Sequence, residues 1–330
     1  NDLRQIGLGL TQKFSDKLKT SVDINDQNIF RHGSKYELNT MSIINELDFD
    51  SSKLSIGLLN STDKDVGNKK QIKHTDYFTQ WQGLILDNEL SIGARITDHD
   101  KFSTHSTYNF NWAKDLSATL RINGSYGTAT NLPNHYKNNA NIVAGKTSLK
   151  PEHSKNLEVG LTGDYEWGNV ELKLYKSKLT DAFKYVASPL HYKNDGTVNI
   201  QGAELSIGTE LLGWDFDSSI DFNKAVAAAT DLQKGRRPNR SISLNLSKTS
   251  GKWKRNINWA AKSWAWDKDA HTNDVKLGGY GLLNLSTSYD FTDSLSVYLN
   301  RNNVLDKDYE MASGYKTLGK TSTLGLTYNF

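Results

Sequence analysis

The sequence predicts an all-β protein, folded as a transmembrane, antiparallel, up-and-down β-barrel. Three observations lead to this fold class: apolar and polar residues alternate with a period of two, short and long connections alternate along the chain, and aromatic residues lie beside the short connections. The mean hydropathy of −0.62 is compatible with a membrane barrel, because every second residue of each strand faces a polar interior. No stretch approaches the ~18–20 consecutive apolar residues that a transmembrane helix needs. We expect residues 1–330 to form a single β-barrel domain.

Period-two alternation is the strongest of these signals, and no long segment carries an apolar stripe at helical spacing. In four clear segments the apolar positions are Leu90, Ile92, Ala94 and Ile96; Leu116, Ala118, Leu120 and Ile122; Leu283, Leu285, Tyr289 and Phe291; and Leu324, Leu326, Tyr328 and Phe330.

The connections alternate between short and long. Short turns are expected at 14–17, 49–53, 86–89, 113–115, 166–168, 211–213, 250–252 and 291–294. Long polar loops are expected at about 25–36, 61–74, 97–103, 127–153, 226–239, 266–279 and 303–320, with a shorter crossing near 188–190. In outer-membrane barrels the short turns face the periplasm and the long loops face outside.

Aromatic side chains gather beside the short turns, as expected of a girdle where hydrocarbon meets lipid headgroups. They are Phe14, Phe49, Trp112, Tyr165, Trp167, Trp214, Phe216, Trp253, Tyr289 and Phe291. A soluble β-sandwich or propeller would also alternate, but it would not explain why the rings favour one class of turn.

The predicted strand count is odd. Alternating segments number about 17, whereas bacterial single-chain barrels use even numbers. The first strand, 4–14, and the last, 320–330, both run toward the side of the short turns. A barrel with both termini in the periplasm begins with a strand that runs the other way, so the parity predicts that the chain starts in mid-barrel.

Composition and motifs exclude several classes of function. The chain has no Cys, so disulfides and thiolate metal sites are excluded. Its 40 Lys+Arg balance 37 Asp+Glu, so no nucleic-acid partner is indicated. The start lacks the apolar segment of a signal peptide. Catalytic and phosphate-binding motifs are absent from the sequence, and we expect no catalytic residues, no resident metal and no cofactor.

Several short motifs, in order and at consistent spacing, resemble the TonB-dependent receptor family. They are Ser125-Tyr126-Gly127-Thr128-Ala129 with Pro133; Ser148-Leu149-Lys150-Pro151-Glu152 with Ser154; Glu158 and Gly160; Asn194-Asp195-Gly196 with Ile200, Gly202 and Glu204; and Asn303 to Tyr309, Gly314, Tyr315, Gly319, Lys320 and Phe330. The resemblance covers the last ~200 residues and implies the carboxy-terminal part of a 22-stranded barrel. About five opening strands, the plug domain and the TonB-contacting segment have no counterpart in this sequence. Two turns depart from the family pattern, at 145–148 and at Val304-Leu305.

Within the family the sequence is most similar to cobalamin (vitamin B12) receptors. The similarity lies in Val275-Lys276-Leu277-Gly278-Gly279 and in Lys307-Asp308-Tyr309-Glu310 with Gly314-Tyr315. The resemblance implies import of cobalamin driven through TonB, assembly by the barrel-assembly machinery, and contact with outer-membrane lipid and lipopolysaccharide. A ferric-siderophore or haem receptor remains open as an alternative, as do a hydrolase at the barrel rim and a passive porin.

The ligand is expected at the extracellular loops, where Tyr, Trp and Asn offer stacking and hydrogen bonds. The candidates are Tyr126, Asn131, His135, Tyr136, Tyr192, Trp266, Tyr309 and Tyr315. For His135 we favour the alternative of a solvated loop histidine over a ligand-binding one. The resemblance implies that Tyr328 and Phe330 form the signal for barrel assembly.

Three further features have weaker functional interpretations. Trp264 and Trp266 could stack on a flat ligand, but an outer girdle is favoured. The segment 63–67 faintly resembles a calcium loop and lacks the remaining ligands. Asp98, His99, Asp100 and His105 could hold a metal or form an acid–base pair, although we expect a charged hairpin tip in water.

Overall fold

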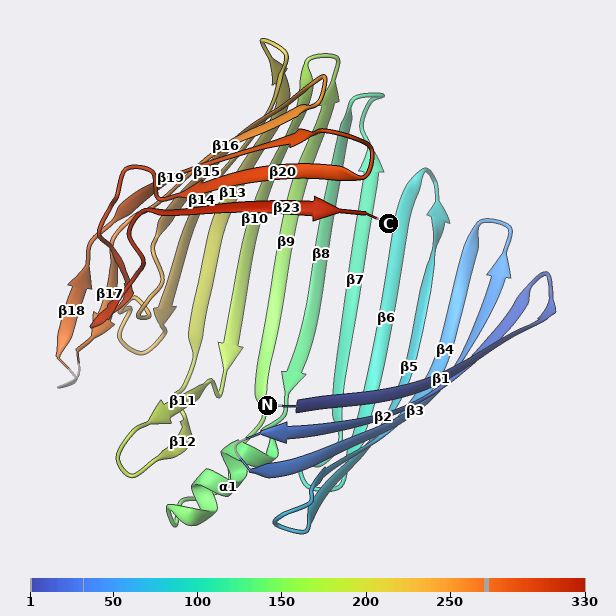
Figure 1. Cartoon of the computed structure of the whole chain (residues 1–330). Helices are drawn as coiled ribbons and strands as arrows, with labels where there is room; N and C mark the ends of the chain where they lie inside the picture. Colours follow the sequence, from blue (N-terminus) through green and yellow to red (C-terminus); the bar gives the residue numbers. More distant parts are fainter. Residues whose placement is uncertain (1, 32, 270–272, 330) are drawn as a thin grey trace. The chain divides into compact units, whose positions relative to one another are not determined.

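The computed structural model describes residues 2–31, 33–269 and 273–329 (Figure 1). Seventeen strands belong to one large sheet within this described part, which confirms the predicted all-β class and strand count. They are β1 (Asp2–Ser15), β2 (Leu18–Arg31), β3 (Ser34–Phe49), β4 (Ser52–Asp65), β5 (Lys70–Ile85), β6 (Asn88–His99), β7 (His105–Asp115), β8 (Leu120–Asn131), β9 (Glu152–Tyr165), β10 (Gly168–Thr180), β13 (Val198–Leu211), β14 (Trp214–Ala227), β15 (Arg240–Ser250), β16 (Trp253–Lys262), β19 (Tyr280–Asp290), β20 (Leu295–Asn302) and β23 (Thr321–Tyr328).

Shorter elements lie in the connections. These are helix α1 (His135–Val143) and the hairpin strands β11 (Phe183–Val186), β12 (His191–Asn194), β17 (Ala265–Lys268), β18 (Asp274–Leu277), β21 (Glu310–Ala312) and β22 (Tyr315–Lys316). No helix in the described ranges is both long enough and apolar enough to cross a membrane.

The chain divides into two compact units. Unit 1 comprises Asn1–Asp115, Asn123–Leu157 and Lys178–Thr197. Within it β1 to β7 pair antiparallel in chain order, each with the next. Strands that neighbour one another in sequence therefore neighbour one another in the sheet, as an up-and-down topology requires.

Unit 2 comprises Leu116–Ile122, Glu158–Ser177 and Val198–Phe330. Its main strands form a second antiparallel run, in the order β13, β14, β15, β16, β19, β20 and β23. The order skips β17–β18 and β21–β22, which form separate two-stranded hairpins within the loops.

Two connections expected to be long loops are mostly strand. The segment 25–36 continues the β2–β3 ladder as far as the pair Arg31↔Ser34. The segment 61–74 leaves only 66–69 outside strands β4 and β5. These expectations were wrong because the strand ends are polar on both faces, and polar strands then resemble loops in hydropathy.

The turn expected at 113–115 lies further along the chain. Leu116 and Ala118 belong to this turn and not to a strand, because the N–H groups of Leu116 and Ser117 both donate to the carbonyl of Leu120. The Ser117 hydroxyl also accepts from the N–H groups of Thr119 and Leu120. Alternation over four residues here imitates a strand, and local hydrogen bonds to a serine decide against it.

Helix α1 was not expected within the predicted loop 127–153. Asn134 caps it, since its side-chain oxygen accepts from the N–H of Lys137 at 3.0 Å. Asn is among the preferred N-cap residues because it satisfies a helix donor that has no partner within the helix. The helix has no hydrophobic stripe, so its position depends on polar contacts with neighbouring loops.

The two faces of the unit 1 sheet differ in chemistry. The pairs Ile92↔Phe110 and Leu90↔Trp112 place large apolar side chains on one face, where Ile92 and Phe110 are exposed. The intervening positions Ser91, Asn109 and Asn111 place polar groups on the other face. Exposed apolar side chains in a regular band are what a membrane-facing surface requires.

Rings expected beside the short turns are found there. In unit 2, Tyr165 stacks on Trp167 at 5.6 Å, and Trp253 and Tyr289 lie 4.8 Å apart. In unit 1, Phe14 and Phe49 are exposed beside the first two such turns. This arrangement agrees with the girdle predicted from the sequence.

Candidate functional site

Helix α1 rests on the tip of the β4–β5 hairpin through a buried carboxylate. Asp65 is fully buried, and its oxygens accept from the Asn68 side chain at 2.8 Å and from the Asn139 side chain at 2.7 Å. Lys70 donates to Asn139 Oδ1 at 2.9 Å and completes the link between helix and hairpin. Asp65 lies in the segment 63–67 that faintly resembles a calcium loop. Its carboxylate accepts hydrogen bonds from side-chain amide groups.

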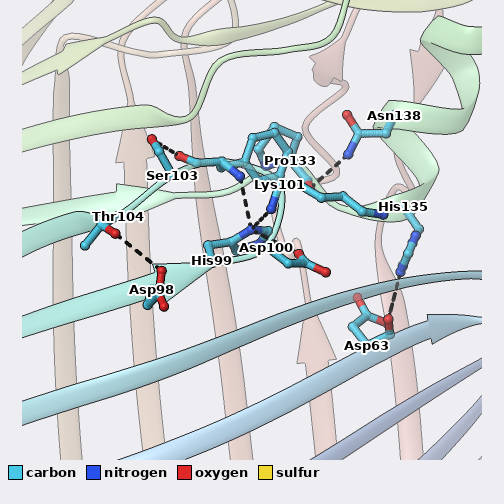
Figure 2. Close-up of polar contacts among 11 residues, drawn as sticks. Asp63, Asp98, His99, Asp100, Lys101, Ser103, Thr104, Pro133, His135 and Asn138 are labelled. Carbon is cyan, nitrogen blue, oxygen red and sulfur yellow. Dashed lines mark hydrogen bonds and ion pairs between the residues drawn. The ribbon is translucent and has the colours of Figure 1, made fainter.

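His135 opens helix α1 and is buried, so the expectation of a solvated loop histidine was wrong. Its Nε2 lies 3.1 Å from the backbone oxygen of Asp63 and 3.7 Å from the Asp63 carboxylate (Figure 2). The ring therefore serves to attach the helix to β4. With 5% of its side chain exposed, His135 has little surface with which to contact a ligand.

Asn141 joins the other end of the helix to the β11–β12 hairpin. Its side chain is buried, donates to Tyr192 O at 2.9 Å and to Thr147 O at 2.9 Å, and accepts from Tyr192 N at 2.7 Å. Lys137 adds a cation–π contact, 4.2 Å from the Phe183 ring centroid. Buried polar groups satisfied in this way order the segments that share them.

Three tyrosines meet on this assembly, and we refer to Tyr136, Tyr185 and Tyr192 as the tyrosine patch. Tyr192 packs edge-on against Tyr136 at 6.3 Å and against Tyr185 at 5.7 Å. Tyr136 and Tyr185 are 54% and 53% exposed. The sequence predicted Tyr136 and Tyr192 as ligand-binding residues and missed Tyr185, which faces Tyr192 in the hairpin register.

Two other predicted residues of this region lie outside the patch. Asn131 ends β8 and donates to the Glu152 carboxylate at 2.6 Å, an interaction between neighbouring strand ends. Tyr126 lies within β8 beside Tyr108, with ring centroids 6.0 Å apart.

The acid–histidine cluster at the β6–β7 tip is a structural turn. The His99 ring is buried, and its Nδ1 accepts from the N–H groups of Lys101 at 2.9 Å and Phe102 at 3.2 Å (Figure 2). Burial lowers the pKa of His99, although Asp100 acts in the opposite direction. The expectation of a charged tip in water was wrong for His99, and an imidazole committed to the backbone is unsuited to acid–base catalysis.

The polar face of unit 1 carries a pocket of about 270 Å³ near this tip. Its walls include His74, Asp76, Arg95, Thr97 and His105. Asp76 accepts from Thr97 and lies 3.7 Å from the Arg95 guanidinium. Arg95 thus belongs to a polar wall with charges of both signs.

In unit 2 a second carboxylate ties outer loops together. Asp267, on β17, accepts from Arg236 Nε at 2.8 Å and from Ser313 N at 2.7 Å. Burial opposes ionisation of Asp267, but the hydrogen bonds from Ser313 and Arg236 hold the pKa of its carboxyl below the usual value. Three loop segments therefore meet at the Asp267 carboxylate.

The aromatic candidates of unit 2 form two pairs. Trp266 packs edge-on against Trp264 at 5.6 Å, with Lys276 lying 4.4 Å from the Trp264 ring centroid. Tyr309 packs on Tyr280 at 4.4 Å. For Trp264 and Trp266 the sequence left two alternatives, an outer girdle and stacking on a ligand. The contact between Lys276 and the Trp264 ring is typical of a polar loop surface.

The last of the predicted site residues lie near the end of the chain. Tyr315 lies on β22 with 72% of its surface exposed. Tyr328 ends β23 and is exposed in phase with Leu326. Phe330 lies outside the described residues. Within 2–31, 33–269 and 273–329, no cluster of three or more His, Asp or Glu side chains is arranged to hold a metal ion.

Comparison with known proteins identifies the family. The family described as TonB dependent receptor-like, beta-barrel, matches residues 5–304. The chain belongs to this family. Its members are outer-membrane proteins of Gram-negative bacteria, and this places the chain in that membrane.

Individual relatives match over part of their length. A vitamin B12 transporter of Photobacterium profundum is 27% identical over 253 residues, which are 74% of this chain and 41% of that protein. A mutant of the ferric enterobactin receptor of Pseudomonas aeruginosa is 13% identical with a TM-score of 0.82, over 99% of this chain and 62% of the receptor. The siderophore receptor of Acinetobacter baumannii is 15% identical with a TM-score of 0.79, over 99% and 62%. At these identities the solved structures show the fold alone, and the chain spans about two fifths of the length of the vitamin B12 transporter.

Proposed function

We propose that this chain forms barrel wall and ligand-capturing loops of an outer-membrane receptor that imports cobalamin. The tyrosine patch is the observation that carries this proposal. It lies on outer loops that buried side chains hold together, and the chain belongs to the TonB-dependent receptor family. The similarity to a vitamin B12 transporter supports cobalamin as the ligand. Capture and transport, and not catalysis, are the proposed activities.

Preorganisation of the outer loops favours ligand binding at the tyrosine patch. Asp65, His135 and Asn141 are buried and bonded, so helix α1 and the β11–β12 hairpin present Tyr136, Tyr185 and Tyr192 in a defined arrangement. A rigid aromatic surface loses little conformational entropy on binding, which favours high affinity for a large ligand. Tyrosine offers both a flat apolar face and a hydroxyl, and so suits a macrocycle with polar amide groups.

Import also requires energy, because the outer membrane holds no nucleotide. We propose that TonB supplies it through a plug region within the barrel, and that the polar wall around Arg95 and Asp76 lines the passage. Whole cells that express the complete receptor should accumulate labelled cyanocobalamin only when TonB is functional. Accumulation that is equal in cells lacking TonB would indicate a passive pore instead.

Direct binding tests the choice of ligand. We expect the complete receptor to bind cyanocobalamin saturably. The Tyr185→Ala variant should bind it at least about tenfold more weakly, because a stacking contact made by one aromatic side chain contributes about 1–3 kcal/mol. The matched control is Tyr77→Ala, a tyrosine on β5 that is 53% exposed, as Tyr185 is, and lies outside the patch. Unchanged affinity in Tyr185→Ala would exclude the patch from the binding site.

A ferric-siderophore receptor is the second candidate function. The observation in its favour is the likeness to siderophore and enterobactin receptors over 99% of this chain. Ferric enterobactin, tested in the same binding assay, should not compete with cyanocobalamin. Saturable binding of the iron chelate together with absent cobalamin binding would reverse the choice.

A further inference from the structure

A pocket of about 450 Å³ lies where β7, β8, β9 and β10 approach the outer loops in unit 1. Tyr108, Thr130, His153, Lys155 and Lys178 are among its lining residues. It is distinct from the tyrosine patch, with which it shares no residue.

Hydrogen bonds across the strand ends build the pocket wall. The N–H of Tyr108 on β7 donates to Thr128 on β8 at 3.0 Å. Thr130 on β8 lies 3.1 Å from His153 Nδ1 on β9, and Thr180 on β10 donates to His153 O at 3.2 Å. Four consecutive strands are thus joined at this level, which gives the pocket a defined shape.

The pocket opens on the apolar, membrane-facing side of the sheet. Tyr108 faces Ala94 in register, in the same phase as the exposed Phe110 and Ile92. Lys155 lies two residues from Leu157 on β9 and shares its face, and Leu157 is 50% exposed. Aromatic rings mark the level of the membrane interface, so the lysines stand where the apolar band gives way to headgroups.

The charged side chains that line the pocket are positive. Lys155 and Lys178 contribute two ammonium groups, and its lining residues include no carboxylate side chain. Within the part of the chain that the structure describes, neither lysine has an ion-pair partner. Serine and threonine hydroxyls beside the lysines add hydrogen-bond donors, a combination suited to a phosphate group.

We propose that this pocket binds the phosphate headgroup of an outer-leaflet lipid, with Lys155 and Lys178 holding the phosphate and Tyr108 and Leu157 contacting the acyl chain. The position decides for a lipid phosphate over a free one, because the pocket is continuous with the apolar band. Such a lipid would contact the four strands β7, β8, β9 and β10 from the membrane side. Helix α1 connects β8 to β9, and the β11–β12 hairpin follows β10.

Native mass spectrometry of the complete receptor in detergent tests the proposal, because it measures how much lipid remains bound. The probe is diphosphorylated lipid A, and its dephosphorylated form serves as the comparison. We expect preference for the phosphorylated lipid, and we expect the double variant Lys155→Gln/Lys178→Gln to bind it about 25-fold more weakly, at about fivefold for each lysine. Lys155→Arg/Lys178→Arg should retain binding, since the charge remains.

The matched control is Lys184→Gln/Lys193→Gln, which removes the same charge from the β11–β12 hairpin, where both lysines pair with Asp195. It should bind the lipid as the unmodified receptor does. Heat-dependent mobility on gels confirms that each variant is folded. Equal binding by the Lys155/Lys178 Gln variant, equal binding of dephosphorylated lipid, or displacement of the lipid by inorganic phosphate at the same concentration would each overturn the proposal.

Discussion

His99 illustrates how one buried side chain shapes an outer turn. Its Nδ1 accepts two backbone N–H groups, and its ring lies parallel to that of His74, with centroids 6.0 Å apart. Only the neutral imidazole can accept at Nδ1. Because burial lowers the pKa of His99 in the folded turn, the unfolded turn takes up a proton first as the pH falls.

We therefore expect the β6–β7 tip to be most stable above the ordinary imidazole pKa of about 6.5 and to lose stability as the pH falls below it. Hydrogen exchange of the Lys101 and Phe102 amides measures this directly. Their protection should fall by up to about tenfold per pH unit in that range. His99→Gln should abolish the pH step, whereas His191→Gln, in the β12 strand, should leave it in place. Constant protection down to pH 5 would contradict the role of His99.

Other residue positions were predictable only in part. His135 and Asp65 were recognised as unusual in sequence, but their burial was not foreseen. His135 meets the backbone of Asp63, which lies 72 positions earlier in the chain, and Asp65 meets Asn139, 74 positions later. Contacts across such separations depend on the sheet register, and a local pattern contains no information about it.

Helix α1 and the β11–β12 hairpin behave as one element joined at Asn141. Replacing Asn141 with Ala would leave Tyr192 N, Tyr192 O and Thr147 O without their side-chain partner. Buried groups left unsatisfied cost about 1–3 kcal/mol. We expect Asn141→Ala to release the hairpin locally while the barrel strands stay intact.

Limited proteolysis of residues 183–194 measures the effect: cleavage in Asn141→Ala should be at least about tenfold faster, as a loss of about 1.4 kcal/mol implies. The matched control is Asn138→Ala, which removes a single bond to Pro133 O at 3.3 Å. If both variants are cleaved at the unmodified rate, the hairpin is held by other contacts.

The strands themselves were predicted far better than their connections. About seventeen strands were expected and seventeen belong to the sheet within the described ranges, yet 25–31 and 34–36 proved to be strand and 116–119 proved to be turn. Inside the membrane, alternation is enforced by two different solvents on the two faces. Beyond it both faces meet water, so hydropathy no longer separates a strand from a loop.

At the scale of the whole molecule, the membrane determines which face of the sheet tolerates charge. Ile92 lies on the exposed apolar face of β6, and its neighbour Ser91 lies on the polar face. An arginine on the lipid face near the middle of the membrane costs about 2–4 kcal/mol, and one in the lumen costs far less.

We expect Ile92→Arg to lower the free energy of unfolding by about 2–4 kcal/mol and Ser91→Arg to change it by less than about 1 kcal/mol. Denaturant titration of the complete receptor refolded in lipid vesicles measures both. The two variants add the same side chain one position apart, so they differ only in the face. Equal losses in both would show that the assignment of the faces is wrong.

The fold class, the number of strands, the two faces of the sheet and the family resemblance could all be predicted from the order of the residues. These follow from period-two alternation and from short motifs, which are properties of neighbouring residues. The tertiary structure alone decided that His135, Asp65 and Asn141 are buried joints, that Tyr185 completes a patch with Tyr136 and Tyr192, and that Lys155 and Lys178 share a pocket. The physical reason is that each of these features joins side chains from different strands or loops, and only the register and the packing of the loops bring them together.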